Sequence, residues 1–276
     1  MVLKDILVHV DESANCAVRI KAAVALAELH NAALTGLYVI PHPDIPAYVD
    51  FEIPEDILAE REAELVNQAG IAEKAFAAAS GALGSAASWR CETGHPLSIL
   101  LHRSRYTDLI MVGSKDMEGA EVVFAGYAEK LALESGTAVL VLPREIGEFD
   151  VSFKNILLGW NESRESTRAL HDALPLLQRS DKVTAVSIRR RHEALAGDAA
   201  DALTQYLLHH GIACDRKLVD NPSGSTGEAL LELAEICAAD LIVSGAYGHT
   251  RFRELVLGGV TRHLLTHAPI PVLIAH

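Results

Sequence analysis

The chain has 276 residues, 50% of them hydrophobic, which is enough for two domains that each bury a core. Its formal net charge of −13 argues against a nonspecific nucleic-acid surface, because such a surface needs clustered Lys and Arg. No apolar run approaches the ~20 residues that span a bilayer, and the N-terminus lacks a signal-peptide pattern. The cysteines are scattered without a C-x-x-C pair, which favours a reducing compartment: Cys16, Cys91, Cys214 and Cys237. We therefore expect a soluble cytoplasmic protein that binds neither nucleic acid nor membrane.

In the first half of the chain, short apolar strands alternate with longer helical patterns. Ser13 is expected to cap the first helix. The prolines between Pro41 and Pro54 break any periodicity after the second strand. The strands are predicted at Ile6–Val10, Leu34–Ile40, Ala86–Cys91, Leu109–Val112 and Ala138–Leu142, and the helices at Ala17–Leu29, Ile57–Ala79, Leu97–Ser104 and Tyr127–Leu133.

A short acidic stretch, Glu145–Asp150, is predicted to link this half to a second one with the same order of elements. Because the linker is short, we expect the halves to pack together. The second-half strands are predicted at Ile156–Gly159, Val183–Ile188, Ala213–Val219, Leu241–Ser244 and Val272–Ile274, and the helices at Ser166–Leu177, Ala199–His210, Gly227–Cys237 and Val260–Thr266.

The two halves are an internal repeat. The stretch Asp5–Ser13 matches Asn155–Ser163, 150 positions later, and Val139–Val141 matches Val272–Ile274, 133 positions later. The first copy therefore carries extra residues in its middle. We predict two domains, at residues 1–147 and 148–276.

Alternating strands and helices imply parallel sheets with helices on both faces. Ligands of such sheets bind at the carboxyl ends of the strands, where the strand order switches. Four residues lie just after the end of a predicted strand and are candidates for such a site: Asp11, Gly113, Asn161 and Gly245.

Each half also contains two glycines thirteen residues apart, after an apolar strand. They are Gly113 and Gly126 in the first half, and Gly245 and Gly258 in the second. A glycine-rich turn that leads into a helix can hold a phosphate on backbone N–H groups. The second copy keeps an intervening glycine, Gly248, whereas the first copy has an aspartate there.

The pattern Gly245-x-x-Gly248, nine residues, then Gly258-Gly259-Val260-Thr261 resembles the nucleotide loop of universal stress proteins. The run Asp11-Glu12-Ser13 after the first strand is also similar to that family, and the resemblance covers nearly the whole chain as two copies. It implies two doubly wound parallel-sheet domains, Rossmann-like and similar to adenine-nucleotide alpha hydrolases. It further implies that their last strands pack together as an intramolecular pseudo-dimer, and that the protein acts in stress adaptation.

The resemblance makes the second half a site for ATP, AMP or ADP, with Mg²⁺ able to accompany the nucleotide. Asn161 and Ile188 would lie near the adenine, Ile188 through its backbone. The glycines and the following helix N-terminus would receive phosphate, and His249 and Arg251 add positive charge. Two residues depart from the family pattern, since Gly259 replaces a Ser or Thr and Asn161 replaces an acid. The candidate cofactor-binding residues are Asn161, Ile188, Gly245, Gly248, His249, Arg251, Gly258, Gly259, Val260 and Thr261.

The first half keeps Asp11 but has an altered loop. Asp116 aligns with Gly248, Glu118 with Thr250 and Glu121 with Arg253, so the local charge is inverted. Tyr127 stands where the family has Ser or Thr. Two like charges about 4 Å apart repel by about 1 kcal/mol in water and by several-fold more at lower dielectric. We predict that this half does not bind ATP and serves as a scaffold or holds an uncharged or cationic ligand.

Signatures of catalysis are missing from the sequence. It has no G-x-x-x-x-G-K-[ST] loop, no G-x-S-x-G elbow and no adenylyl-transfer motif. His263 and His267 share a helix face, but no nearby Cys or carboxylate completes a metal site, so no metal and no catalytic residue is assigned. The leading interpretation is a nucleotide-responsive binding protein with a protein partner, and a homodimer of the two-domain chain is left open. The alternatives are a slow ATPase or phosphotransferase that uses His249, and an interaction scaffold without ligand.

Overall fold

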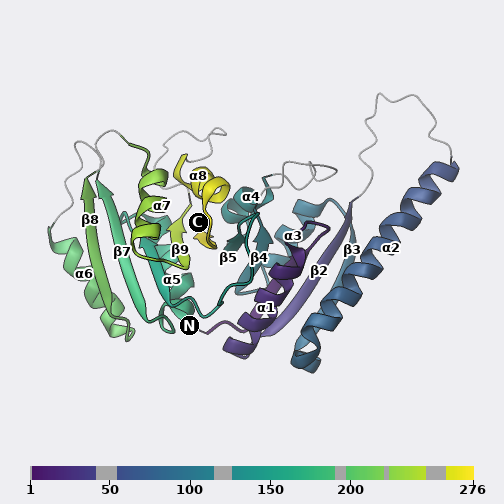
Figure 1. Ribbon diagram of the computed structural model, residues 1–276, viewed down its shortest axis with the longest axis horizontal. Helices are drawn as coiled ribbons and strands as arrows, with labels where there is room; N and C mark the ends of the chain where they lie inside the picture. Colours follow the sequence, from purple (N-terminus) through teal and green to yellow (C-terminus); the bar gives the residue numbers. More distant parts are fainter. Residues whose placement is uncertain (1, 42–54, 115–125, 190–196, 221–223, 247–258) are drawn as a thin grey trace.

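The computed structural model describes residues 2–41, 55–114, 126–189, 197–220, 224–246 and 259–276, and shows alternating strands and helices throughout (Figure 1). The first half contains β1 (Asp5–Val10), α1 (Cys16–His30), β2 (Ala33–Pro41), α2 (Glu55–Ser80), a 3₁₀ turn (Gly81–Ala86), β3 (Ala87–Gly94), α3 (Pro96–Ser104), β4 (Leu109–Gly113), α4 (Tyr127–Glu134) and β5 (Ala138–Leu142). The second half contains β6 (Asn155–Gly159), α5 (Arg164–Leu177), β7 (Lys182–Arg189), α6 (Gly197–His209), β8 (Cys214–Asp220), α7 (Thr226–Ile236), β9 (Leu241–Gly245), α8 (Gly259–His267) and β10 (Val272–Ala275). Every element expected from the sequence is present.

All ten strands form one sheet in the order β3-β2-β1-β4-β5-β10-β9-β6-β7-β8. Within each half the strands are parallel, and the order reverses between β1 and β4 and again between β6 and β9. Helices α1, α2, α5 and α6 contribute to the core on one face, while α3, α4, α7 and α8 contribute to the core on the other. The predicted doubly wound architecture is therefore confirmed for both halves.

The halves join through their last strands, as expected. β5 and β10 pair antiparallel, with Val139 opposite Ile274 and Val141 opposite Val272. This pairing covers two apolar edges that would otherwise present unpaired backbone groups. The result is an intramolecular pseudo-dimer with one continuous sheet.

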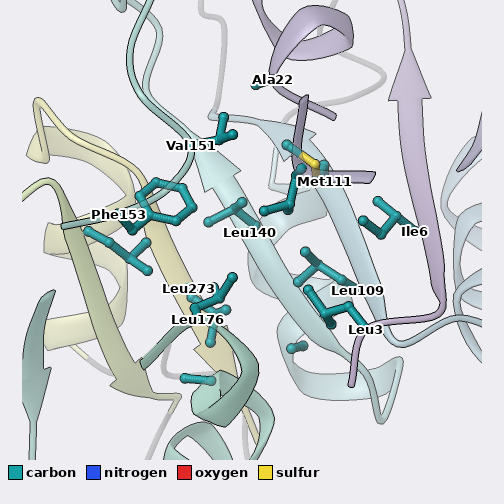
Figure 2. Close-up of a cluster of buried hydrophobic side chains, with 14 of the residues drawn as sticks. Leu3, Ile6, Ala22, Leu109, Met111, Leu140, Val151, Phe153, Leu176 and Leu273 are labelled. Atoms are coloured by element: carbon teal, nitrogen blue, oxygen red, sulfur yellow. The ribbon is translucent and has the colours of Figure 1, made fainter. Parts of the chain in front are cut away.

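The core also continues across the junction (Figure 2). Leu140 of β5 and Leu273 of β10 lie in the same buried cluster as Val151 and Phe153, which follow the linker. Phe153 is fully buried. The chain is thus anchored in the core directly after the linker, and the halves pack together as the short connection predicted.

One expected cap is wrong. Helix α1 begins after Asn15, which makes no side-chain cap hydrogen bond. Ser13 instead donates its hydroxyl to Asp11 Oδ1 at 2.5 Å. Its repeat partner, Ser163, does cap its helix: Ser163 Oγ accepts from the Ser166 N–H at 3.1 Å. The turn that follows β1 and carries Asp11 therefore has a different hydrogen-bonding pattern from the turn that follows β6.

None of the described helices combines the length and apolar character needed to cross a bilayer.

Candidate functional site

The second half brings three of the candidate residues to one edge of the sheet. Asn161 follows β6, Ile188 lies near the end of β7 and Gly245 ends β9, and these strands are neighbours in the order β9-β6-β7. The Trp160 N–H donates to the Val186 carbonyl at 2.9 Å, which holds the end of β6 beside β7. This edge is the reversal point of the half, where open α/β sheets bind ligands.

Gly245 is required by close packing. A Cβ on this residue would lie 2.5 Å from both Glu165 C and Ser166 N, in the first turn of α5. Those are backbone atoms and cannot move aside as a side-chain tip would. The end of β9 therefore contacts the start of α5 closely only because residue 245 has no side chain.

Asn161 is held in a turn that leads into α5. Its Oδ1 accepts from the Ser163 N–H at 3.2 Å, and Ser163 then caps the helix. The amide side chain carries no charge, so the second-half strand end is neutral at the position where the first half has Asp11.

Helix α8 supplies the remaining candidates that the structure describes. Gly259 is exposed and faces open space, Val260 is half-buried, and Thr261 is buried. A crossover helix begins at the edge where its preceding strand ends, so α8 starts on the same side as Gly245. The other four candidates, Gly248, His249, Arg251 and Gly258, lie outside the described residues.

The equivalent edge of the first half is built differently, around a buried cluster of three ionisable residues. Arg19 of α1 is 1% exposed and places its Nη2 2.6 Å from Asp11 Oδ1. Its Nε donates to the His9 carbonyl at 2.8 Å. His9 Nδ1 lies 3.4 Å from Asp11 Oδ2. We call these three residues the buried triad.

The triad fixes the charge of each member. Burial lowers the pKa of His9 to about 4, and Arg19 adds to that effect while Asp11 opposes it. Burial disfavours the charged form of Asp11, yet Arg19, His9 and the Ser13 hydroxyl together hold the pKa of that carboxyl well below its usual range. At neutral pH the triad is therefore a neutral imidazole beside an intact carboxylate–guanidinium pair.

Arg19 also occupies the space beneath Gly113, the first glycine of the altered loop. A Cβ on Gly113 would lie 2.6 Å from Nη1 of Arg19. In the second half the matching glycine, Gly245, packs on helix backbone instead. The acids Asp116, Glu118 and Glu121, which the sequence analysis placed in the first-half loop, lie outside the described residues.

Above the triad lies a pocket of about 300 Å³. Its floor is formed by the carboxyl ends of β1, β2 and β4, and its outer wall by α2. The lining is His9, Val10, Asp11, Glu12, Ser13, Tyr38, Val39, Pro41, Arg61, Glu64, Leu65, Gln68, Leu100, Val112, Gly113, Ser114 and Tyr127. We refer to it as the first-half pocket.

Acids that line this pocket are already hydrogen-bonded within the chain. The Tyr38 hydroxyl donates to Glu12, and burial together with that bond raises the pKa of Tyr38. Gln68 Nε2 donates to Glu64 Oε1 at 3.0 Å. Tyr38 also lies beside Trp89 of β3, with ring centroids 6.4 Å apart.

The helix that would receive phosphate in the first half carries its own anion. Glu129 lies in the first turn of α4, is 9% exposed, and would have its Oε2 3.5 Å from a Cβ on Gly126. The matching residue in α8 is Thr261, 132 positions later. A carboxylate at a helix N-terminus satisfies the positive end of the dipole that would otherwise attract an external anion.

A second cavity of about 710 Å³ lies between α4 and α8, where the two halves meet. Lys130, Arg262, His263 and His267 line it, together with Glu129. The imidazoles of His263 and His267 stack with centroids 4.3 Å apart. Among the residues that the structure describes, no group of three His, Cys, Asp or Glu side chains could hold a metal ion.

Neither the triad nor the outer wall of the first-half pocket was predicted from the sequence. A signal for the triad was present, because Arg19 lies on the apolar face of its helix, four residues before Ala23 and seven before Leu26. At 150 positions further on, the repeat has Ala169 at this place, and Gly159 at the place of His9. No such signal in the sequence indicated that α2 forms a wall of this pocket.

The fold defines a tandem α/β protein made of two Rossmann-like units. The sequence model of the universal stress protein family matches residues 3–143 and again residues 152–276, and the chain belongs to this family. Universal stress protein Slr1230 of Synechocystis sp. is 44% identical over 50 residues, which are 18% of this chain and 17% of that relative's length.

Solved structures share the fold over the full length. A universal stress protein from Archaeoglobus fulgidus superposes with a TM-score of 0.70 at 16% identity, over 98% of this chain and 95% of that one. A protein of unknown function from Pseudomonas aeruginosa gives a TM-score of 0.62 at 12% identity, over 99% and 92% of the two chains. At these identities the likeness concerns the fold alone.

Proposed function

We propose that the second half of this universal stress protein binds ATP or a related adenine nucleotide, and that occupancy changes which partner protein the chain binds during stress adaptation. The observation that carries the proposal is the close contact of Gly245 with the start of α5, beside the neutral Asn161 at the reversal point of the sheet. At the place of Asp11 this half therefore has a neutral amide, and Gly245 meets helix backbone.

Two further features support a nucleotide in this half. The glycine spacing of Gly245, Gly248 and Gly258 is that of the family's nucleotide loop, and it leads into α8. Thr261, a hydroxyl residue, stands in the first turn of α8 where α4 has a carboxylate. A helix N-terminus without an acid favours an incoming phosphate. In this proposal the first half binds no nucleotide.

The chain offers its own reporter for this binding. It contains two tryptophans, and Trp160 directly precedes Asn161. In the variant Trp89→Phe, titration with ATP and Mg²⁺ should give a saturable change in the emission of Trp160. A flat titration over the millimolar range would overturn the proposal.

The role of the second-half loop in ATP binding is tested by replacing Gly248 with aspartate, the residue that the first half has at this position. Gly248→Asp, in the Trp89→Phe background, should weaken ATP binding at least ten-fold, which corresponds to about 1.4 kcal/mol. The matched control is Gly147→Asp, because Gly147 lies in the linker and a Cβ there meets no atom within 4 Å. Equal losses in the two variants would show that the charge acts nonspecifically and would remove the loop from the proposal.

A further inference from the structure

The first-half pocket is a cavity whose chemistry differs from that of a nucleotide site. Its floor is the strand edge that carries Asp11, but Asp11 is committed to Arg19 at 2.6 Å and to Ser13 at 2.5 Å. A ligand that needed this carboxylate as an acceptor would have to compete with a buried guanidinium. The side chain of Asp11 is only 18% exposed, so little of it is left to meet a ligand.

The charges around the pocket also disfavour an anion. Three carboxylates line it, from Asp11, Glu12 and Glu64, and two guanidiniums accompany them, Arg61 in the lining and Arg19 behind the floor. The balance is −1. Each of the three acids already accepts a hydrogen bond within the chain. The net negative charge therefore disfavours an anion, and a cation would have to share carboxylates that already accept hydrogen bonds within the chain.

The rest of the surface is apolar or neutral. Val10, Val39, Leu65, Leu100 and Val112 supply aliphatic walls from β1, β2, α2, α3 and β4. Tyr38, Gln68, Ser114 and Tyr127 add neutral groups. A concave, mostly apolar cavity with a few placed polar groups is the usual form of a small-molecule site, and 300 Å³ lies at the small end of that range.

We propose that the first-half pocket binds an uncharged, mainly apolar small molecule, independently of nucleotide in the second half. Helix α2, which supplies Arg61, Glu64, Leu65 and Gln68, forms the outer wall that makes the cavity concave. Figure 1 shows this helix running along the β3 side of the sheet, at the far end of the molecule from β8.

Two dyes with the same skeleton test the charge selectivity. N-phenyl-1-naphthylamine is uncharged, and 8-anilino-1-naphthalenesulfonate is the same molecule with a sulfonate. With the full-length protein, the uncharged dye should give saturable fluorescence at one site, and the sulfonate should bind at least ten-fold more weakly. Equal affinities, or no saturable binding of the uncharged dye, would overturn the proposal.

The place of binding is tested with a matched pair on α2. Leu65 lines the pocket, whereas its neighbour Val66 is 58% exposed and does not. Leu65→Glu should weaken the uncharged dye at least ten-fold, and Val66→Glu should leave it unchanged, with circular dichroism showing that both variants fold. Equal behaviour of the two variants would place the dye elsewhere and overturn the proposal.

Energy transfer gives a second location test and separates this site from the nucleotide site. Trp89 lies 6.4 Å from Tyr38 of the pocket, while Trp160 belongs to the other half. The dye should quench Trp89 in Trp160→Phe more strongly than it quenches Trp160 in Trp89→Phe. ATP should not displace it. Displacement of the dye by ATP in Trp160→Phe would make the first-half pocket a nucleotide site and overturn this proposal, whatever ATP does to Trp160.

Discussion

The first half has His9, Asp11 and Arg19 where the second has Gly159, Asn161 and Ala169. The order of elements is the same in both places: a strand ends, a turn follows, and a helix begins. In one copy the space between strand end and helix is filled by an ion pair and an imidazole, and in the other it is left to small neutral residues. Three residue differences on one arrangement of elements thus change the charge and the filled space at the reversal point of the sheet.

The ion pair between Asp11 and Arg19 is not needed to stabilise this fold. A buried ion pair seldom stabilises a fold more than apolar packing of the same volume does, but removing one partner is expensive. The second half shows that the fold does not need the pair. The presence of the triad in the first half therefore does not follow from the fold itself.

The largest expected effect comes from breaking the pair. Arg19→Ala leaves the Asp11 carboxylate without its guanidinium and opens a cavity in α1. We expect a loss of about 3–5 kcal/mol in the free energy of unfolding, toward the lower end because the Asp11 side chain is 18% exposed. Urea denaturation measures this loss.

The double variant Arg19→Ala/Asp11→Asn reproduces the residues of the second half and sharpens this result. It should lose less than the sum of the two single variants, because no unpaired charge remains. Simple additivity would mean that the two side chains contribute separately, and the contrast between the halves would lose its basis.

The second effect is a pH dependence that the second half lacks at this position. His9 has a pKa of about 4 in the folded protein and 6.5 in the unfolded chain. Above pH 6.5 it is neutral in both states. As the pH is lowered from 6.5 to 4, the unfolded chain takes up a proton that the folded protein does not. The free energy of unfolding therefore decreases as the pH is lowered, by about 3 kcal/mol at most.

His9→Gln should remove this part of the pH dependence. The variant loses stability at pH 7, since His9 is buried, but its slope between pH 6.5 and 4 should be shallower than that of the parent. Burial and the nearby Arg179 shift the pKa of His30 in the same direction, and this shift is present in both proteins, so the difference isolates His9. Identical slopes would contradict a desolvated imidazole at this site.

The third effect compares the two glycines. Gly245→Ala forces a Cβ against the backbone of α5, and we expect a loss near the upper end of the about 1–3 kcal/mol typical of overpacking. Gly113→Ala meets the tip of Arg19, which can shift, so its loss should be smaller. In an Arg19→Ala background, Gly113→Ala should cost still less. A greater loss for Gly113→Ala than for Gly245→Ala in the parent would reverse this ranking.

Most of the architecture could be predicted because it depends on periodicity and repetition. The offset between Asp5–Ser13 and Asn155–Ser163 gave the two copies, and the apolar strands Ala138–Leu142 and Val272–Ile274 gave the junction. Both signals can be recognised in the sequence without knowledge of which residues are in contact.

The first-half pocket could not be predicted, because it depends on contacts between distant residues. Nothing in the sequence distinguishes Leu65 and Gln68 from other helix residues, and they become pocket residues only because α2 lies over the ends of β1 and β2. The Ser13 cap was wrong for a related reason: its hydroxyl bonds to Asp11, whose carboxylate is held by Arg19 from within the helix. A cap rule considers only the local chain, whereas this turn is set by a buried ion pair.

The smallest expected effect concerns the first turn of α4. Glu129→Thr introduces the residue type of Thr261, the matching residue in α8, and removes a carboxylate from a helix N-terminus, where an acid contributes about 0.3–1 kcal/mol. Glu134→Thr is the matched control, because Glu134 is exposed in the last turn of the same helix, where a carboxylate opposes the dipole. Urea denaturation should show a small loss for the first variant and no loss or a slight gain for the second.

Glu129→Thr combined with Asp116→Gly then asks whether the altered loop alone keeps ATP out of the first half. Read from Trp89 in the Trp160→Phe background, the combined variant should still show no ATP binding, because Arg19 continues to hold Asp11 and to fill the space beneath Gly113. Binding that appeared without touching Arg19 would place the selectivity in the loop charges. Binding that appeared only after Arg19→Ala/Asp11→Asn was added would place it in the triad, since that change alone gives the strand end the neutral character of Asn161 and Ala169.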